Sequence, residues 1–257
     1  MKTAKYLLIV ATLCFGQSHA MEGVFDRSAE AAHYIEQINS TPSQEAMIEV
    51  LKPIYISGIG DEQLAKTLGD RLLKDLPKID TSRTSSQYGA WMVKVLASTG
   101  SEYAGEVITE VSKRTSVRRV LIACDDKLHQ IDWERRKNEI MASRVNFNEG
   151  DDMKIAQLMN LLKDPDFTYK QNAAYRMSWD KILDARLMEE IARQVQVFAD
   201  KNGVSYNKGE IVAMSHFVKM LGYSGNVGYR PLLVAVSKSK ADQIVIGQTN
   251  AAIRKLK

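Results

Sequence analysis

Cysteine and histidine are scarce in this chain, and both shortages exclude classes of chemistry. The 257 residues include two cysteines and four histidines. Cys14 lies in an N-terminal segment with the pattern of a cleavable signal, so Cys124 would be left alone and no intrachain disulfide could form. His129 has Asp125 and Asp126 at helical spacing, but zinc takes three or four ligands. We therefore expect no metal site and no cofactor.

The chain also lacks a second long apolar run and a large excess of one charge. Its longest apolar run, residues 6–15, is shorter than the roughly twenty residues that cross a bilayer. The 35 basic and 31 acidic residues give a net charge of +4, which falls to +2 without Lys2 and Lys5. Surfaces devoted to nucleic acid normally carry a larger and more clustered basic excess. We expect no integral membrane segment after signal cleavage and no nucleic-acid partner.

The first twenty residues have the composition of an export signal. Lys2 and Lys5 precede the apolar run, and the small residues Ser18 and Ala20 follow it. This pattern predicts cleavage after Ala20 and a periplasmic or secreted protein of the Gram-negative type. An N-terminal core helix is the alternative, but the charged start, the short run and the small-residue exit occur together.

The rest of the sequence contains a repeat. Residues 92–131 align with residues 217–256 without a gap. The identical pairs include Val93/Val218, Lys94/Lys219, Leu96/Leu221, Gly100/Gly225 and Val120/Val245. Several other aligned positions are apolar in both copies, as expected if the copies bury the same helix faces. A repeat of this kind predicts a stacked helical array.

Apolar residues recur at spacings of three and four through most of the chain, which predicts an all-α fold. Asp61 and Asp184 are expected to cap equivalent helices, at a shift of two residues in the alignment. Gly100 and Gly225 are expected to end another equivalent pair. Cys124 lies on an apolar helical stripe, which indicates a buried, inert thiol rather than a nucleophile.

These patterns divide the chain into five parts. They are a signal peptide (1–20), an N-terminal capping segment (21–42), a first half (43–131), a polar helical bridge and hinge (132–152), and a second half (153–257). The helix that begins near Ser116 is expected to run on to about Ala142, roughly 40 Å at 1.5 Å per residue. The hinge is expected at residues 146–152.

A pattern of spaced residues in the first half resembles that of a known type of helical repeat. The pattern consists of Asp61, Leu64, Leu68 and Leu72, then Ala90, Trp91, Met92, Lys94, Leu96, Gly100 and Tyr103. It resembles the HEAT-type repeats of exported bacterial proteins over most of residues 43–141 and 166–257. The resemblance implies a curved stack of antiparallel helix pairs (an α-solenoid) with one face available to a protein or peptide. It implies no catalytic residues, because such arrays share a packing pattern and not a chemistry.

Two clusters of aromatic and basic residues form the candidate binding site. They are Trp133, Arg135 and Arg136 in one half, and Tyr175, Arg176 and Trp179 in the other. Large amphipathic side chains beside guanidinium groups are enriched at binding hot spots. Alternatively, Tyr175 and Trp179, four residues apart, pack between helices, and the arginines form exposed ion pairs. We assign Trp91 to the core.

The sequence contains no nucleophile elbow and no phosphate-binding glycine loop. The leading hypothesis is a non-enzymatic periplasmic binding scaffold or adaptor that presents a helical-repeat groove to an envelope protein or peptide. The alternative is an envelope enzyme, or an accessory subunit of one, whose site is assembled from distant helices. A third and weaker hypothesis is attachment to a membrane surface through Arg254, Lys255 and Lys257. The partner and the oligomeric state are left open.

Overall fold

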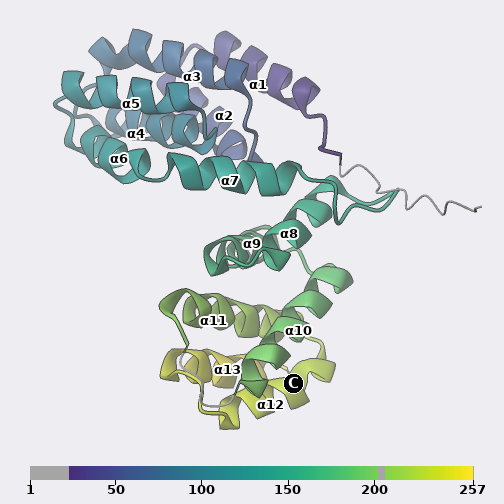
Figure 1. Cartoon of the computed structure of the whole chain (residues 1–257). Helices are drawn as coiled ribbons and strands as arrows, with labels where there is room; N and C mark the ends of the chain where they lie inside the picture. Colours follow the sequence, from purple (N-terminus) through teal and green to yellow (C-terminus); the bar gives the residue numbers. More distant parts are fainter. Residues whose placement is uncertain (1–22, 202–205, 257) are drawn as a thin grey trace, which may run out of the picture.

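The computed structural model describes residues 23–201 and 206–256, and within them the protein is all-helical (Figure 1). These residues form thirteen α-helices and two short 3₁₀ helices, and their one β-type pairing is an isolated bridge between Val24 and Ser143. The predicted all-α class is confirmed for this part of the chain. The predicted signal peptide, residues 1–20, lies outside the described residues.

Six helices and one short 3₁₀ turn precede α7 (Ile131–Ala142), and from here on we call them the first half, which takes in α1 from the predicted capping segment. They are α1 (Ser28–Ser40), α2 (Gln44–Ser57), α3 (Glu62–Asp75), η1 (Leu76–Lys78), α4 (Arg83–Ser98), α5 (Glu102–Arg114) and α6 (Arg118–Leu128). Alternate helices pack on one another, so that α1, α3 and α5 form one row and α2, α4 and α6 form another. The Asp61 carboxylate accepts a hydrogen bond from Leu64 N at the start of α3, which confirms the predicted cap.

The second half also has six α-helices and one short 3₁₀ helix, which here follows the fourth α-helix instead of the third. They are α8 (Met153–Lys163), α9 (Phe167–Asp180), α10 (Ala185–Asp200), α11 (Lys208–Tyr223), η2 (Val227–Tyr229), α12 (Arg230–Lys238) and α13 (Gln243–Lys255). Here α8, α10 and α12 form one row, and α9, α11 and α13 form the other. The predicted Asp184 cap is confirmed, because its carboxylate accepts from Arg186 N and Leu187 N.

The helix boundaries repeat at the spacing of the sequence alignment. Helices α4 and α11 begin 125 residues apart, at Arg83 and Lys208, and α6 and α13 also begin 125 residues apart. Helices α3 and α10 begin 123 residues apart, which matches the expected shift of two. Gly100 and Gly225 both adopt positive φ, at 71° and 69°, just beyond α4 and α11. Glycine favours this left-handed conformation because it lacks a Cβ atom.

The predicted long helix between the halves is two helices. Helix α6 ends at Leu128, and α7 spans Ile131–Ala142. Gln130 N donates to Lys127 O at 3.0 Å, a bond that tightens the chain into a turn, and the Gln130 side chain bonds to Asp126 and Lys127. The prediction of one continuous helix was therefore wrong. Helix α7 contacts α4 and α5 on one side and α8 on the other.

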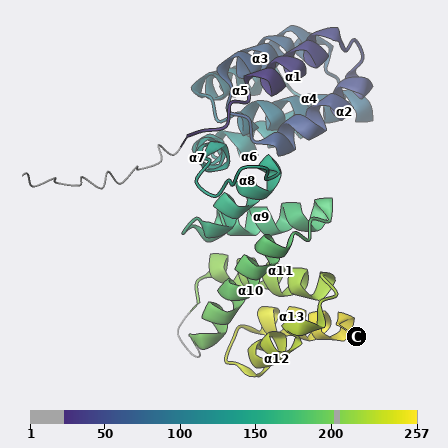
Figure 2. The same ribbon diagram turned by 90° about the vertical axis from the view of Figure 1, so that its right-hand side faces the viewer.

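The segment that precedes α1 is held against the loop after α7. Phe25 N donates to Ala142 O at 2.8 Å, and the Phe25 and Phe147 rings meet edge to face at 5.1 Å. The stretch predicted as a hinge is tied to the second half as well, because Asp151 pairs with Arg186 at 2.8 Å. Helix α1 continues from the N-terminal segment as the first member of its row (Figures 1 and 2).

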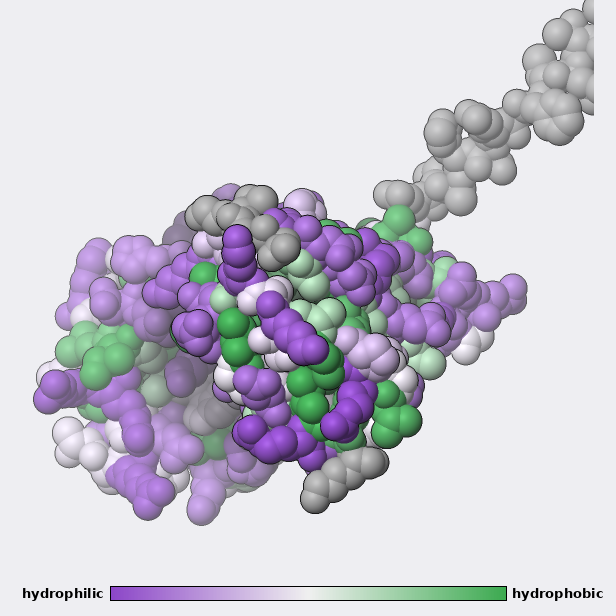
Figure 3. All heavy atoms as spheres, turned by 90° about the horizontal axis from the view of Figure 1, so that it is seen from below, coloured by the Kyte–Doolittle hydropathy of each residue, from purple (hydrophilic) through white to green (hydrophobic). Residues whose placement is uncertain are grey.

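The apolar side chains form two separate cores. One contains buried residues from Ala31 to Ile131, and the other contains buried residues from Ile140 to Leu256. Cys124 is buried in the first core, as predicted, and burial raises its pKa to about 11. The end of the molecule formed by α12 and α13 has a mainly hydrophilic surface with separate hydrophobic patches (Figure 3).

Candidate functional site

Two connected hollows lie between the first half and α9. Their volumes are about 420 and 300 Å³, and they share Tyr55 and Ile56 of α2 with Tyr175 and Arg176 of α9. We call them together the inter-half groove. The larger hollow also includes Lys52, Trp91, Trp179 and Asp180, and the smaller one includes Gln130, Trp133, Glu134, Lys137 and Asn172. The groove therefore combines side chains from both halves.

Aromatic rings form the wall of the larger hollow. Tyr55 lies in the last turn of α2 and meets Trp91 edge to face at 5.9 Å. Tyr175 and Trp179 lie four residues apart on α9, which places them on one helix face, and their rings stack at 6.3 Å. Tyr175 is 55% exposed and Trp179 is 70% exposed. This stack is an apolar surface that the described residues leave largely open to solvent.

Arg176 adds a charge to the groove, and none of the carboxylates in the described part of the chain forms an ion pair with it. Its Nη1 donates to the Met141 sulfur at 3.2 Å, and its Nε is buried without a hydrogen-bond partner among residues 23–201 and 206–256. Asp180, one turn further on, pairs with Lys154 at 2.7 Å. Burial lowers the pKa of Arg176 to about 10, and attraction from Asp180 only partly opposes this shift. An acceptor on a bound molecule would satisfy the free donor.

The smaller hollow has a polar floor. The Trp133 ring stacks on Tyr169 at 5.1 Å, and its Nε1 donates to Thr168 Oγ1 at 2.9 Å. Lys137 and Glu134, one turn apart on α7, form a buried ion pair, and burial lowers the pKa of Lys137. The side-chain oxygen of Asn172 is buried, and no donor within the described ranges reaches it.

The structure brings together four of the six predicted site residues: Trp133, Tyr175, Arg176 and Trp179. Arg135 lies outside the inter-half groove, where its Nε donates to Gly100 O at 2.9 Å and its Nη1 pairs with Asp132 at 3.2 Å.

Arg136 also lies outside the inter-half groove, because it is exposed and pairs with Glu139 at 3.3 Å. Arg135, two residues after Trp133, faces another side of α7, whereas Arg136, three residues after it, lies on a neighbouring position of the helix surface but is directed to Glu139.

Tyr55 and Trp91 line the inter-half groove but were not predicted as site residues. Trp91 packs against the first core but is only half-buried, and one side of it lines the groove. Residues 92 and 93, not 91, are fully buried in this turn, and Phe217, the aligned partner of residue 92, is equally buried. Tyr55 could not be found by spacing, since α2 meets α9 only through the fold.

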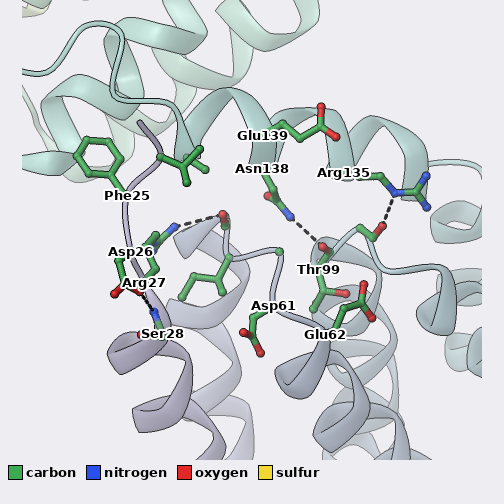
Figure 4. Close-up of a pocket in the computed structure, with 16 residues that line it drawn as sticks. Phe25, Asp26, Arg27, Ser28, Asp61, Glu62, Thr99, Arg135, Asn138 and Glu139 are labelled. Carbon is green, nitrogen blue, oxygen red and sulfur yellow. Dashed lines mark hydrogen bonds between the residues drawn. The ribbon is translucent and has the colours of Figure 1, made fainter. Parts of the chain in front are cut away.

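A further hollow of about 630 Å³ lies beside α7, where the N-terminal segment meets the ends of α2, α3 and α4 (Figure 4). Its polar groups mainly hold these ends together. Arg27 donates to Ser57 O at 2.8 Å, and Asn138 Nδ2 donates to Ser98 O and Thr99 O at 2.8 and 3.0 Å. We read this hollow as a structural junction.

A fourth hollow, of about 830 Å³, lies between α4 and α6. Its basic lining residues are Arg83, Lys94, Arg118 and Arg119, and we call it the cationic hollow. Trp91 borders both the cationic hollow and the inter-half groove.

Comparisons with known proteins found no matching family model, no matching curated protein and no matching solved structure. In the described part of the chain, no three His, Cys, Asp or Glu side chains gather as metal ligands would. None of the helices described for residues 23–201 and 206–256 has both the length and the apolar character needed to cross a bilayer.

Proposed function

We propose that the chain is a HEAT-like α-solenoid of two duplicated halves that is exported to the periplasm. The two rows of helices in each half and the 125-residue spacing of α4 and α11 support the duplication. The basic start, apolar run and small-residue exit of residues 1–20 support export. Mass spectrometry of the N-terminus of the protein recovered from a periplasmic fraction tests both cleavage after Ala20 and location.

We further propose that the protein is a non-enzymatic scaffold or adaptor whose inter-half groove holds a segment of an envelope protein. The observation that carries this function is the exposed Tyr175–Trp179 stack beside the unpaired Arg176 Nε. Exposed rings and an unsatisfied buried donor both cost free energy in the unbound protein. A bound segment would cover the rings and supply the acceptor, which is the usual composition of a binding hot spot.

The test is site-specific photo-crosslinking in the native host. The photoreactive amino acid p-benzoylphenylalanine replaces Trp179 in one variant and Tyr223 in the other. Tyr223 lies on α11, outside the four hollows described above, and is 46% exposed, so it serves as a matched aromatic control. We expect irradiation to join position 179, but not position 223, to one defined segment of one envelope protein. The same products from both positions, or none from position 179, would disprove the groove as a binding site.

A further inference from the structure

The cationic hollow concentrates positive charge that the described structure does not neutralise. Arg83, Arg118 and Arg119 are exposed, and none of the described carboxylates lies within 4.0 Å of these residues or of Lys94. The acid that lines this hollow, Asp126, lies 3.6 Å from Lys127. The hollow therefore presents basic groups to solvent without a counter-charge of their own.

The position of these residues makes the positive charge costly for the fold. Arg83 is the first residue of α4, and Arg118 and Arg119 are the first two of α6. A helix N-terminus carries partial positive charge, so basic residues there are disfavoured and acidic ones are favoured. Neither helix has an acidic residue in its first turn. The partial positive charges of the two helix N-termini and the charges of the arginines therefore add to the positive potential of the cationic hollow.

The second half shows that the helical packing does not require this charge. Helices α11 and α13 pack together as α4 and α6 do. The positions 125 residues after Arg83, Lys94, Arg118 and Arg119 are Lys208, Lys219, Gln243 and Ile244. The arginines of α6 are thus replaced by an amide and an apolar residue in the equivalent helix. Arg118 and Arg119 are therefore not required by the packing that the two pairs of helices share.

Trp91 connects this charge to the proposed binding groove. It borders the cationic hollow, where Lys94 Nζ lies 5.7 Å from its ring, and it also borders the inter-half groove. A ligand that follows this surface would pass from the arginines, over Trp91, to the Tyr175–Trp179 stack and Arg176.

Resting on the function proposed above, we infer that the bound segment is an acidic peptide with an apolar anchor. Its carboxylates face Arg118, Arg119 and Arg176, and its apolar side chain packs on the Tyr175–Trp179 stack. A peptide fits better than a polyanion such as nucleic acid, because the excess of positive charge is confined to the cationic hollow and Arg176. In the rest of the inter-half groove, Glu134 and Asp180 are balanced by Lys137 and Lys154, which leaves nothing to hold a continuous negative backbone. Charges at one end and aromatic rings at the other suit a segment of mixed composition.

The test is selection of peptides from a phage-displayed library of random dodecapeptides on the protein, residues 21–257. Selected peptides are labelled and measured by fluorescence anisotropy against three variants. Arg118→Glu/Arg119→Glu reverses charge in the cationic hollow, and Trp179→Ala removes the anchor site. Lys208→Glu/Lys219→Glu makes the same charge change in the second half. Circular dichroism of each variant establishes that it is folded.

We expect the selected peptides to be rich in Asp and Glu around an aromatic or aliphatic residue. Arg118→Glu/Arg119→Glu should weaken peptide binding about tenfold or more. Added salt should weaken the binding of the same peptides to the unaltered protein. Lys208→Glu/Lys219→Glu should leave affinity within about twofold.

Neutral or basic peptides that need Trp179 but ignore Arg118→Glu/Arg119→Glu would overturn the acidic ligand and leave the scaffold function standing. Peptides whose affinity is unchanged by Trp179→Ala, or a selection that yields no peptides, would overturn both the acidic ligand and the scaffold function. Tighter binding of a single-stranded oligonucleotide that depends on Arg118 and Arg119 would replace the peptide by nucleic acid.

Discussion

At the scale of one residue, Arg176 is a cation that reduces the stability of the protein, because the described side chains do not compensate its partial burial. A buried ion costs several kcal/mol of desolvation, and only good partners repay that cost. Arg176 as a whole is partly buried, but its Nε is fully buried without a partner among the described residues, and its Nη1 contacts a sulfur. The free protein therefore holds a cation that its own described side chains do not satisfy.

This cost predicts a gain in stability when the charge is removed. Arg176→Met keeps a long, flexible side chain, and we expect it to raise the free energy of unfolding by about 1 kcal/mol or more. Urea denaturation at pH 7 measures the change. Arg176→Lys, which keeps the charge, is the control and should show no gain. A less stable Met variant would mean that the native structure compensates the guanidinium after all.

Asp75 is the opposite case, a buried charge with good partners. Its Oδ2 accepts from Arg71 Nε at 2.6 Å and from the Tyr88 hydroxyl at 2.7 Å, and Arg71 also donates to Ile38 O and Thr41 O. Burial alone would raise the pKa of Asp75, but the bonds from Arg71 and Tyr88 lower it overall. The network joins α1, α3 and α4.

A lowered folded-state pKa fixes the pH dependence of this contribution. The stability is fully present above the unfolded-state pKa of about 4 and is lost as the pH falls through the lower folded-state pKa. We expect Asp75→Asn to cost about 2 kcal/mol at pH 7 and progressively less below pH 4. Denaturation of both proteins between pH 7 and pH 2.5 measures the gap, and a gap independent of pH would contradict the assignment.

The roles of single residues could be predicted from the sequence where a local rule applies. The caps at Asp61 and Asp184 and the buried Cys124 follow from spacing within one helix. Four groove residues were found from composition alone. Tyr55 and the half-buried side of Trp91 were not, because their role depends on α2 and α4 meeting α9, a contact without a signal along the chain.

At the scale of elements, the two equivalent glycines allow a controlled test of how α7 rests on α4. Gly100 and Gly225 have nearly the same positive φ. A Cβ atom at Gly100 would lie 2.5 Å from the Arg135 Cα atom, whereas a Cβ atom at Gly225 would meet no atom within 4 Å. The backbone strain of a substitution is therefore common to both sites, and the clash with α7 is confined to one.

We expect Gly225→Ala to cost about 1–2 kcal/mol, the strain of a left-handed alanine. Gly100→Ala should cost clearly more, because backbone atoms of α7 must also move. Thermal denaturation followed by circular dichroism compares the two variants. Equal losses would show that α7 yields to the new methyl group without energetic consequence.

Element boundaries were predictable where glycine or a capping acid marks them, and the break between α6 and α7 shows the limit. His129 and Gln130 carry no breaker signal, and the apolar stripe of α6 runs on to Ile131. The turn lies in the backbone pairing, because Gln130 N donates to Lys127 O at 3.0 Å, three residues back, and pairing four residues back resumes where Glu134 N donates to Gln130 O at 2.8 Å. Such a change of backbone pairing at a helix end leaves no periodic trace in the sequence.

At the scale of the whole molecule, the two halves have separate cores joined through α7. Ile131, at the start of α7, belongs to the first core, whereas Ile140 and Met141, at its end, belong to the second. Between them, α7 buries the polar residues Glu134, Lys137 and Asn138. In helical arrays each unit is stabilised mainly by its neighbours, so a polar junction should couple the halves more weakly than the apolar packing within each.

This arrangement predicts that the halves unfold at different denaturant concentrations. Trp91 reports on the first core, and Trp133 packs against the second. Two variants that retain only one of these tryptophans, with phenylalanine at the other two tryptophan positions, separate the signals. We expect Leu68→Ala, a truncation in the first core, to lower the stability reported by Trp91 by about 2–5 kcal/mol and to leave the Trp133 transition nearly unchanged. Leu161→Ala, in the second core, should do the reverse, since both leucines are fully buried. If both truncations shift both transitions equally, α7 couples the cores into one cooperative unit.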